Sequence, residues 1–205
     1  FVSGNYIRMD GDSNYDSLQL QVEKKVGDLV FNVHWTWANN MLNYLNTADP
    51  YNVTNNWARD ARTRRHRGVL NLTWDLPFGQ GRQYGSDVSG AADAIMGGWK
   101  ANWISILATG EFFSPSFSGS DPSNTDTSGG LPDRIADGNI DNPDPNKWFD
   151  ATAFTVPENG GFGNSGVNIL THQGMNVHHL SLSKAFTLTE RFRLTYTASF
   201  SNLFN

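Results

Sequence analysis

The sequence predicts an all-β fold: an antiparallel, up-and-down transmembrane β-barrel segment, about six strands of a larger barrel, with long extracellular loops. Three observations predict this fold class. Apolar and polar residues alternate with a period of two in several stretches. These stretches reach about 9–11 residues, the length that a tilted strand needs to cross a bilayer, whereas soluble strands average about 5–6. The connections between them also differ in length as membrane barrels require.

The alternating stretches define the expected strands. In the last stretch Leu194 and Tyr196 alternate with Arg193, Thr195 and Thr197. Successive side chains of a strand point to opposite faces of the sheet, so each strand has one apolar and one polar face. On this pattern we expect strands at about 17–25, 29–39, 67–76, 98–108, 177–185 and 191–202.

The stretch at 98–108 alternates less cleanly than the others. Trp99 and Trp103 share their face with Ser105, while Ile104 and Ile106 fall on the face of the polar residues. A β-bulge near the middle, which inserts one extra residue into a strand, would restore the alternation.

The connections are sorted by length. They run in the order Val26–Asp28, 40–66, 77–97, 110–176 and 186–190. Alternate connections of an up-and-down barrel lie on the same side, and outer-membrane barrels place short turns in the periplasm and long loops outside. The two longest connections fall on one side, so we expect both to be extracellular.

We expect residues 1–205 to form one partial outer-membrane β-barrel domain, with long loops at about 40–66 and 110–176. The chain begins at Phe1 and ends at Asn205 within a strand-like pattern, so both ends look like cut edges of a larger protein. About six strands form only part of a barrel, because about eight are the minimum for closure.

The connection at 110–176 has its own composition. It holds six of the eight prolines and ten of the twenty glycines, which favours turns over strand pairing. Disorder is one interpretation of such a segment. We favour a folded extracellular loop, because Trp148, Phe149, Phe154 and Phe162 supply side chains that can pack together.

Aromatic residues lie toward strand ends or on the apolar faces. We interpret them as interfacial girdle residues, whose rings lie at the level of the lipid headgroups. The alternative is the core of a soluble sandwich, which would need a second sheet to cover the apolar face. The residues concerned are Trp35, Trp37, Trp74, Phe78, Trp99, Trp103, Phe186 and Phe192.

Composition and motifs exclude several function classes. Charged residues make up 17% of the chain and the net charge is −5, which argues against a nucleic-acid partner. The absence of cysteine excludes disulfides, thiolate metal sites and a cysteine nucleophile. No zinc motif, nucleophile elbow or phosphate-binding loop occurs. We therefore expect no enzyme activity, no bound metal and no cofactor.

Two clusters of charge remain ambiguous. The basic run 59–67 could bind lipopolysaccharide phosphates or an anionic substrate. We favour the alternative, in which it is a solvated or lumen-facing row of charges paired with acidic loops. Asp137, Asn139 and Asp141 have the spacing of calcium ligands. A calcium-binding EF-hand loop that began at Asp137 would need Gly at position six and Glu at position twelve. Neither requirement is met, so we favour turn formation by Asp and Asn.

Several short motifs together resemble the Oar-like TonB-dependent receptors of the outer membrane. Each motif is weak alone, but their order and spacing extend over nearly the whole chain. They are Arg64–Arg67, Leu76–Gly79, Gly97–Trp99, Leu131–Arg134, Lys147–Asp150, Ala153–Phe154, Phe162–Gly166, Leu182–Phe186, Glu190–Arg191 and Asn202–Asn205.

The resemblance implies a large barrel filled by an N-terminal plug, and active uptake driven by an inner-membrane TonB-type energy-transducing complex. Its expected surroundings are the lipid and lipopolysaccharide of the bacterial cell outer membrane. This chain departs from the family pattern, because it contains no plug domain, no TonB box and no terminal aromatic strand. Val167 also stands where the family pattern has a basic residue.

We therefore expect part of a TonB-dependent transporter that binds and takes up an unidentified substrate. Trp57, Arg134, Trp148 and Phe149 are the predicted substrate contacts, since they are loop aromatics and a cation able to touch a ligand. The alternatives are a soluble secreted all-β carbohydrate-binding module, and a passive porin or structural outer-membrane protein.

Overall fold

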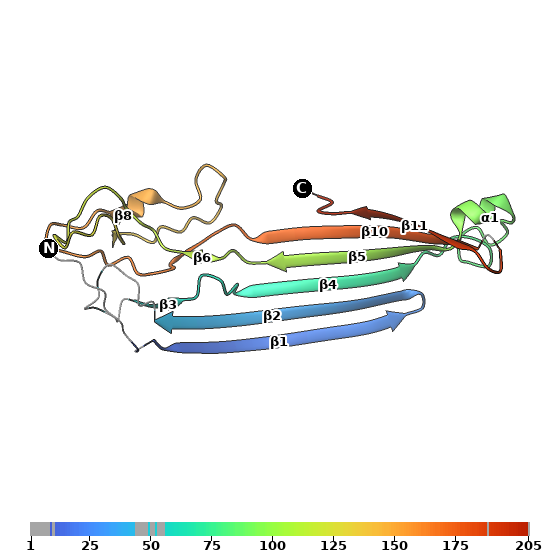
Figure 1. Cartoon of the computed structure of the whole chain (residues 1–205), viewed down its shortest axis with the longest axis horizontal. Coiled ribbons are helices and arrows are strands. Elements are labelled where there is room, and N and C mark those ends of the chain that lie inside the picture. Colours follow the sequence, from blue (N-terminus) through green and yellow to red (C-terminus); the bar gives the residue numbers. More distant parts are fainter. Residues whose placement is uncertain are drawn as a thin grey trace. The chain divides into compact units, whose positions relative to one another are not determined.

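The computed structural model describes Met9, residues 11–43, Asp49, Asn52, residues 56–187 and residues 189–204 (Figure 1). The chain divides into two compact units. The loop unit holds Phe1–Leu18, Trp37–Arg65 and Thr109–Gly174, and the strand unit holds Gln19–Thr36, His66–Ala108 and Met175–Asn205. Most of both long connections expected from the sequence therefore belongs to the loop unit.

Long antiparallel strands form the main sheet in the order β1-β2-β4-β5-β10-β11, and the short β3 pairs with β2. Long strands that follow one another along the chain are neighbours in the sheet, which confirms the predicted up-and-down, all-β fold (Figure 1). The sheet is open, with β1 and β11 at its edges, and so fits part of a barrel. The strands are β1 (Ser13–Val26), β2 (Leu29–Asn43), β3 (Trp57–Arg59), β4 (His66–Asp75), β5 (Trp99–Ala108), β10 (Met175–Thr187) and β11 (Arg193–Phe200).

The register of β5 needs no bulge. Its pairing with β4 and with β10 is continuous along the strand, so the extra residue that the sequence suggested is absent. The alternation is irregular for another reason. Ile106 lies on the polar face between Val69 and Val177, which form a small apolar patch there. Ser105 lies on the apolar face, where its hydroxyl accepts a hydrogen bond from Trp103 Nε1 (2.6 Å).

The strand ends confirm the sorting of the connections. Ala108, the last residue of β5, pairs with Arg67 near the start of β4 and with Met175 at the start of β10. Both long connections therefore adjoin the same end of the sheet. The other end carries the tight turn at Gly27, whose positive φ of 57° favours glycine, and the connection that holds the helix α1 (Ala91–Met96).

The long second connection is folded, as expected. It contains two small antiparallel ladders and a short helix around the buried side chains of Leu170 and Ala153. The first ladder pairs β6 (Phe112–Phe113) with β9 (Leu170–Thr171), and the second pairs β7 (Asp133–Arg134) with β8 (Phe154–Thr155). The 3₁₀ helix η2 spans Ala151–Ala153 and begins at Asp150, whose side chain accepts from the backbone N–H of Thr152.

A disulfide test follows from the register of β10 and β11. Ser181 pairs with Ser199, and their hydroxyl oxygens are 3.2 Å apart. Cysteines at both positions are expected to form a disulfide on mild oxidation, because directly opposite Cβ atoms lie within about 5.5 Å. The control pair, Ser181→Cys with Ala198→Cys, puts the thiols on opposite faces and is expected to stay reduced. Thiol labelling followed by mass spectrometry separates the two. Equal oxidation of both pairs would contradict the register.

Candidate functional site

One face of the main sheet carries a row of polar side chains. The Thr73 hydroxyl on β4 donates to the side-chain oxygen of Asn102 on β5 (3.0 Å). Asn102 pairs with Ser181 on β10, and Ser181 pairs with Ser199 on β11. The row thus crosses these strands without interruption, so this face is suited to contact with water rather than with lipid.

The same face becomes ionic where β4 ends and β5 begins. Lys100 Nζ lies 3.2 Å from a carboxylate oxygen of Asp75, and Lys100 pairs with Ser183. A cavity of about 390 Å³ opens here, and Arg82 and Arg193 also line it. The polar face therefore changes from hydroxyl and amide groups at mid-strand to charged groups at this end.

The opposite face is apolar and partly exposed. Leu72, Trp103, Leu180 and Phe200 form one row across β4, β5, β10 and β11. Leu194, on the same face of β11, is 55% exposed. A sandwich would bury such a face against a second sheet, whereas a membrane barrel presents it to lipid chains. The segregation of the two faces is therefore typical of a barrel wall.

Aromatic rings lie near both ends of this apolar face. At the end where β5 begins, Trp99 contacts Tyr196 edge to face, with ring centroids 6.2 Å apart. Trp74 lies at the same end and is 39% exposed. At the other end, Trp35 stacks on the ring of His66, with centroids 5.7 Å apart. These positions fit the predicted interfacial girdles, where ring faces meet lipid and the polar groups meet headgroups. Trp103, also predicted for a girdle, lies instead at mid-strand between Leu72 and Leu180.

A single lysine interrupts the apolar face of β10. Lys184 is only 4% exposed, and its ammonium group donates a hydrogen bond to the backbone oxygen of Gly97. The ammonium also lies over the rings of Trp99 (5.6 Å to the centroid) and Phe186 (5.1 Å). The long stem of a lysine lets the charge reach polar partners from an apolar surface, and the rings attract the cation. This explains how the face accommodates a positive charge.

The loop unit contains a cavity of about 140 Å³. Its wall combines polar side chains, apolar side chains and glycines. The polar ones are Asp49, Asn52, Asn56 and Ser123. The apolar ones are Phe117, Pro122, Leu131, Pro157 and Phe162. The glycines are Gly129, Gly130, Gly161 and Gly163. A concave site that is mostly apolar and has a few polar groups is the usual form of a small-ligand site.

A tight turn carries Ser123 into the wall of this cavity. The Ser123 hydroxyl donates to the carboxylate of Asp121 (2.6 Å), and the backbone N–H of Asp126 donates to the same carboxylate (2.7 Å). The hydroxyl first, and then the backbone N–H groups, lower the pKa of Asp121 below its ordinary value. The carboxylate therefore stays charged at neutral pH and holds the turn.

Trp57 lies in a different, shallow part of the loop unit. It is 42% exposed on β3 and, with Met41 and Asn168, lines an open cavity of about 290 Å³. The Asn168 side chain anchors this region, because its amide donates to the backbone oxygen of Arg59 (2.6 Å). The structure thus leaves the Trp57 ring accessible to a ligand, as the predicted role requires.

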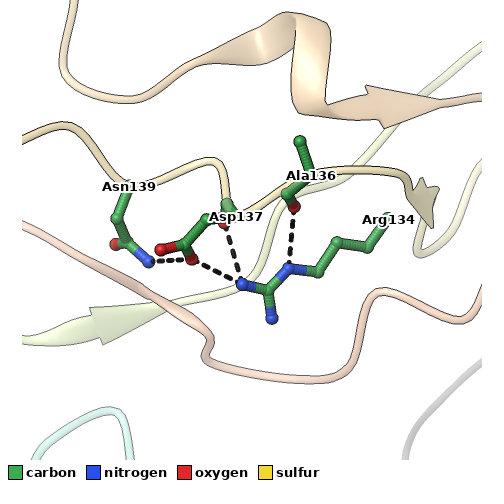
Figure 2. A network of polar contacts seen from close by, with 4 residues as sticks. All are labelled: Arg134, Ala136, Asp137 and Asn139. Carbon is green, nitrogen blue, oxygen red and sulfur yellow. Dashed lines mark hydrogen bonds and ion pairs between the residues drawn. The ribbon is translucent and has the colours of Figure 1, made fainter.

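Arg134 uses its guanidinium group within its own loop (Figure 2). Its Nη2 contacts a carboxylate oxygen of Asp137 at 2.5 Å, and its Nε donates to the backbone oxygen of Ala136 at 3.0 Å. The Asn139 amide donates to the same carboxylate (3.0 Å). The Asp137 carboxylate therefore stabilises a turn by accepting hydrogen bonds from Arg134 and Asn139. This agrees with the interpretation of the acidic run as a turn-forming segment. Among the residues that the structure describes, no cluster of histidines and acids has the arrangement of a metal site.

Trp148 and Phe149 pack against the ladder of β6 and β9. Trp148 donates from Nε1 to the backbone oxygen of Thr171 (2.6 Å), and Phe149 contacts the rings of Phe113 and Phe154. Both side chains are half-buried. Phe154 also pairs with Arg134, so the packing joins Arg134 and Phe149, while Trp57 lies on another strand. The four predicted substrate-binding residues therefore do not come together in one site.

Two arginines of the basic run have partners within the loop unit, and one of them pairs with an acidic loop residue, as the favoured interpretation expects. Arg64 donates to the backbone oxygen of Thr109 (2.6 Å) and pairs with Glu111 (3.1 Å). The guanidinium of Arg59 lies over the Phe112 ring, 4.9 Å from its centroid. Burial, and then the positive charge of a neighbouring arginine, lower the pKa of Arg59 from its ordinary value. These arginines thus tie the two long loops together inside the loop unit.

The cavity residues were not among the sequence-predicted contacts. The one local signal is the pair of adjacent glycines at Gly129-Gly130, which is repeated at Gly160-Gly161. Such pairs mark places where the backbone turns sharply or is closely approached. Nothing in the sequence indicates that the segments around Asn56, Phe117 and Phe162 line the same cavity.

No helix among the described residues is long and apolar enough to cross a membrane. A family model described as an outer membrane β-barrel domain matches residues 1–205. No curated protein and no solved structure matches the chain. The match agrees with the two-faced sheet, and it decides against a soluble secreted module. The chain belongs to the outer membrane β-barrel domain family, whose location is the bacterial outer membrane.

Proposed function

We propose that this chain forms wall strands and external loops of a TonB-dependent transporter of the Oar-like kind. The observation that carries the transport role is the division of the sheet into a polar and an apolar face. The polar row from Thr73 to Ser199 would line the lumen, and the row from Leu72 to Phe200 would face lipid. The coupling to energy rests on the family resemblance of the ordered motifs.

The loops at one end of the sheet would capture the substrate. Their ligand-sized cavity offers hydrogen-bonding groups and two phenylalanine rings, and Trp57 offers a second accessible aromatic surface. Arg134, Trp148 and Phe149 remain predicted contacts, but their hydrogen bonds and ring contacts favour a role in holding the loop shape. The chain would therefore act by binding and admission rather than by catalysis.

The proposed partners follow from the two faces and from the resemblance. Outer-membrane lipid and lipopolysaccharide would surround the apolar face. A TonB-type inner-membrane complex would act through the N-terminal part that the family resemblance implies. The substrate is unidentified, and the acidic net charge of −5 leaves nucleic acid an unsuitable ligand.

Uptake in whole cells tests this function. Compounds that co-purify with the intact barrel protein from spent medium would be identified by mass spectrometry and then supplied in isotopically labelled form. Accumulation is expected to stop when residues 110–174 are replaced by a short linker, or when a protonophore collapses the inner-membrane proton gradient.

Two outcomes separate the proposed transporter from its rivals. Uptake that continues in the presence of the protonophore, and that rises linearly with substrate concentration, would identify a passive porin. Unchanged uptake after loop replacement would remove the capture role. The amount of each variant in the outer membrane, measured by immunoblot, serves as the control for assembly.

A further inference from the structure

We infer that the helix α1 inserts its apolar side chains into the lipid leaflet at the end of the sheet that carries the tight turn. In outer-membrane barrels the end with short turns faces the periplasm. The inference goes beyond the proposed function, because it concerns how the wall is held in the bilayer. It therefore applies to a passive porin as well as to a transporter.

The exposed surface of α1 is apolar. Asp93 is the one charged residue within Ala91–Met96. Ile95 is 70% exposed and Met96 is 44% exposed. Ala92 is also exposed, and it lies on the same side of the helix because residues three and four positions apart are neighbours. A helix that faces water normally carries polar residues on its outer side, so this outer side is suited to an apolar environment.

The connection fixes the helix in place. The Asp93 carboxylate accepts a hydrogen bond from the backbone N–H of Gln80 (2.6 Å), so the charged side chain is used within the connection. A methyl group added at Gly79 would lie 2.5 Å from the Cα atom of Gly97, which shows how closely the segments before and after the helix approach each other. A helix of six residues is not stable alone. These contacts hold it, so its outer side is free to contact lipid.

Two hydrogen bonds place the end of α1 on the apolar face of the sheet, beside the ends of β4 and β5 (Figure 1). Trp99 and Lys184 pair on that face. Trp99 Nε1 donates to the backbone oxygen of Ile95 (2.9 Å), and the Lys184 ammonium donates to that of Gly97. No residue of α1 lines the charged cavity on the polar face. The helix therefore continues the surface that faces lipid.

Aromatic rings indicate the depth of the helix. The same connection holds Phe78 and Tyr84, whose ring centroids are 5.7 Å apart and whose side chains are exposed. Tyrosine and tryptophan are enriched at the boundary between membrane and water. Helices at this boundary bury their apolar side about 5–10 Å into the region where headgroups meet acyl chains. We therefore expect Ile95 and Met96 to contact acyl chains just below the headgroups.

Fluorescence quenching by lipid tests the inference. The chain contains no cysteine, so Ile95→Cys and Met96→Cys can each carry one bimane label, after any cysteine elsewhere in the intact protein has been replaced. The intact barrel protein would be reconstituted into vesicles of brominated phosphatidylcholine. Leu194→Cys and Thr195→Cys are the references, because they lie on the apolar and the polar face at the same end of the sheet. We expect both α1 labels to be quenched to at least about half the extent of the Leu194→Cys label, and the Thr195→Cys label to be quenched little.

Ile135→Cys is the matched control. Ile135 is an isoleucine of similar exposure, 66%, in the loop unit. Its label is expected to be quenched by iodide in the water and not by brominated lipid. If the α1 labels behave in the same way, the helix lies in water and the inference is wrong. If neither quencher reaches them, protein covers the helix, and the inference is equally wrong. Uptake plays no part in this measurement, so its outcome is independent of the proposed transport.

Discussion

Replacing Leu182 with arginine is expected to lower the free energy of unfolding of the barrel by about 2–4 kcal/mol, the cost of a lipid-facing charge near the bilayer midplane. Leu182 lies near the middle of β10, between Ala101 and Ala198 on the apolar face. Its neighbours offer no acidic partner, so the guanidinium would face lipid chains. Urea titration of the barrel in phospholipid vesicles measures the change.

The matched control differs by one position on the same strand. Ser181 pairs with Asn102 and Ser199, and so lies on the polar face. Ser181→Arg is expected to change the free energy of unfolding by less than about 1 kcal/mol, because its charge would remain hydrated. If both variants lose the same stability, the assignment of the two faces to lipid and lumen is wrong.

Gly163→Ala is expected to disrupt the loop unit while leaving the sheet assembled. The added methyl group would lie 1.8 Å from the Leu131 backbone oxygen, so one of the two segments must move. Forcing extra volume into a packed site typically lowers the free energy of unfolding by about 1–3 kcal/mol, and backbone cannot rotate away as a side chain can. Limited proteolysis of the intact barrel protein is expected to cut within 110–174 at a higher rate than in the unchanged protein.

Gly161→Ala is the control for this change. Gly161 lines the same cavity, but a methyl group there would lie 3.4 Å from the backbone oxygen of Glu158. That spacing is close to ordinary contact, so the loop is expected to keep its resistance to protease. Equal cleavage of both variants would show that the close approach of Gly163 to Leu131 does not hold the wall.

The strands could be predicted because their signal is local. Alternation along one strand decides which side chains share a face, whatever the strand pairs with. Thus alternation alone places the apolar residues of β10 and β11, such as Leu180 and Tyr196, on one face, and the pairing of the two strands confirms this. Only at β5 was the alternation misleading. There Ser105 lies opposite the polar His178 and Ile106 lies opposite the apolar Val177, so partners on β10 accommodate the two exceptions.

Lys184 illustrates the boundary between local and tertiary information. Period two places it on the apolar face, where a charge is unfavourable. The compensating groups are the Gly97 backbone oxygen and the Trp99 ring, which belong to a segment far away in the sequence. The sequence pattern therefore shows the anomaly, and the pairing of β10 with β5 explains it.

The sequence alone determined the strands, the two faces of the wall and the end of the sheet that carries the long loops. These depend on residue periodicity and connection length, which are properties of neighbouring residues. The tertiary structure decided the roles of the loop residues. In it, Arg134 forms an ion pair with Asp137 and the Phe149 ring contacts the Phe113 ring. It also contains a loop cavity that the sequence did not indicate. Loop packing depends on side chains from distant segments meeting at short range, and no local pattern encodes such meetings.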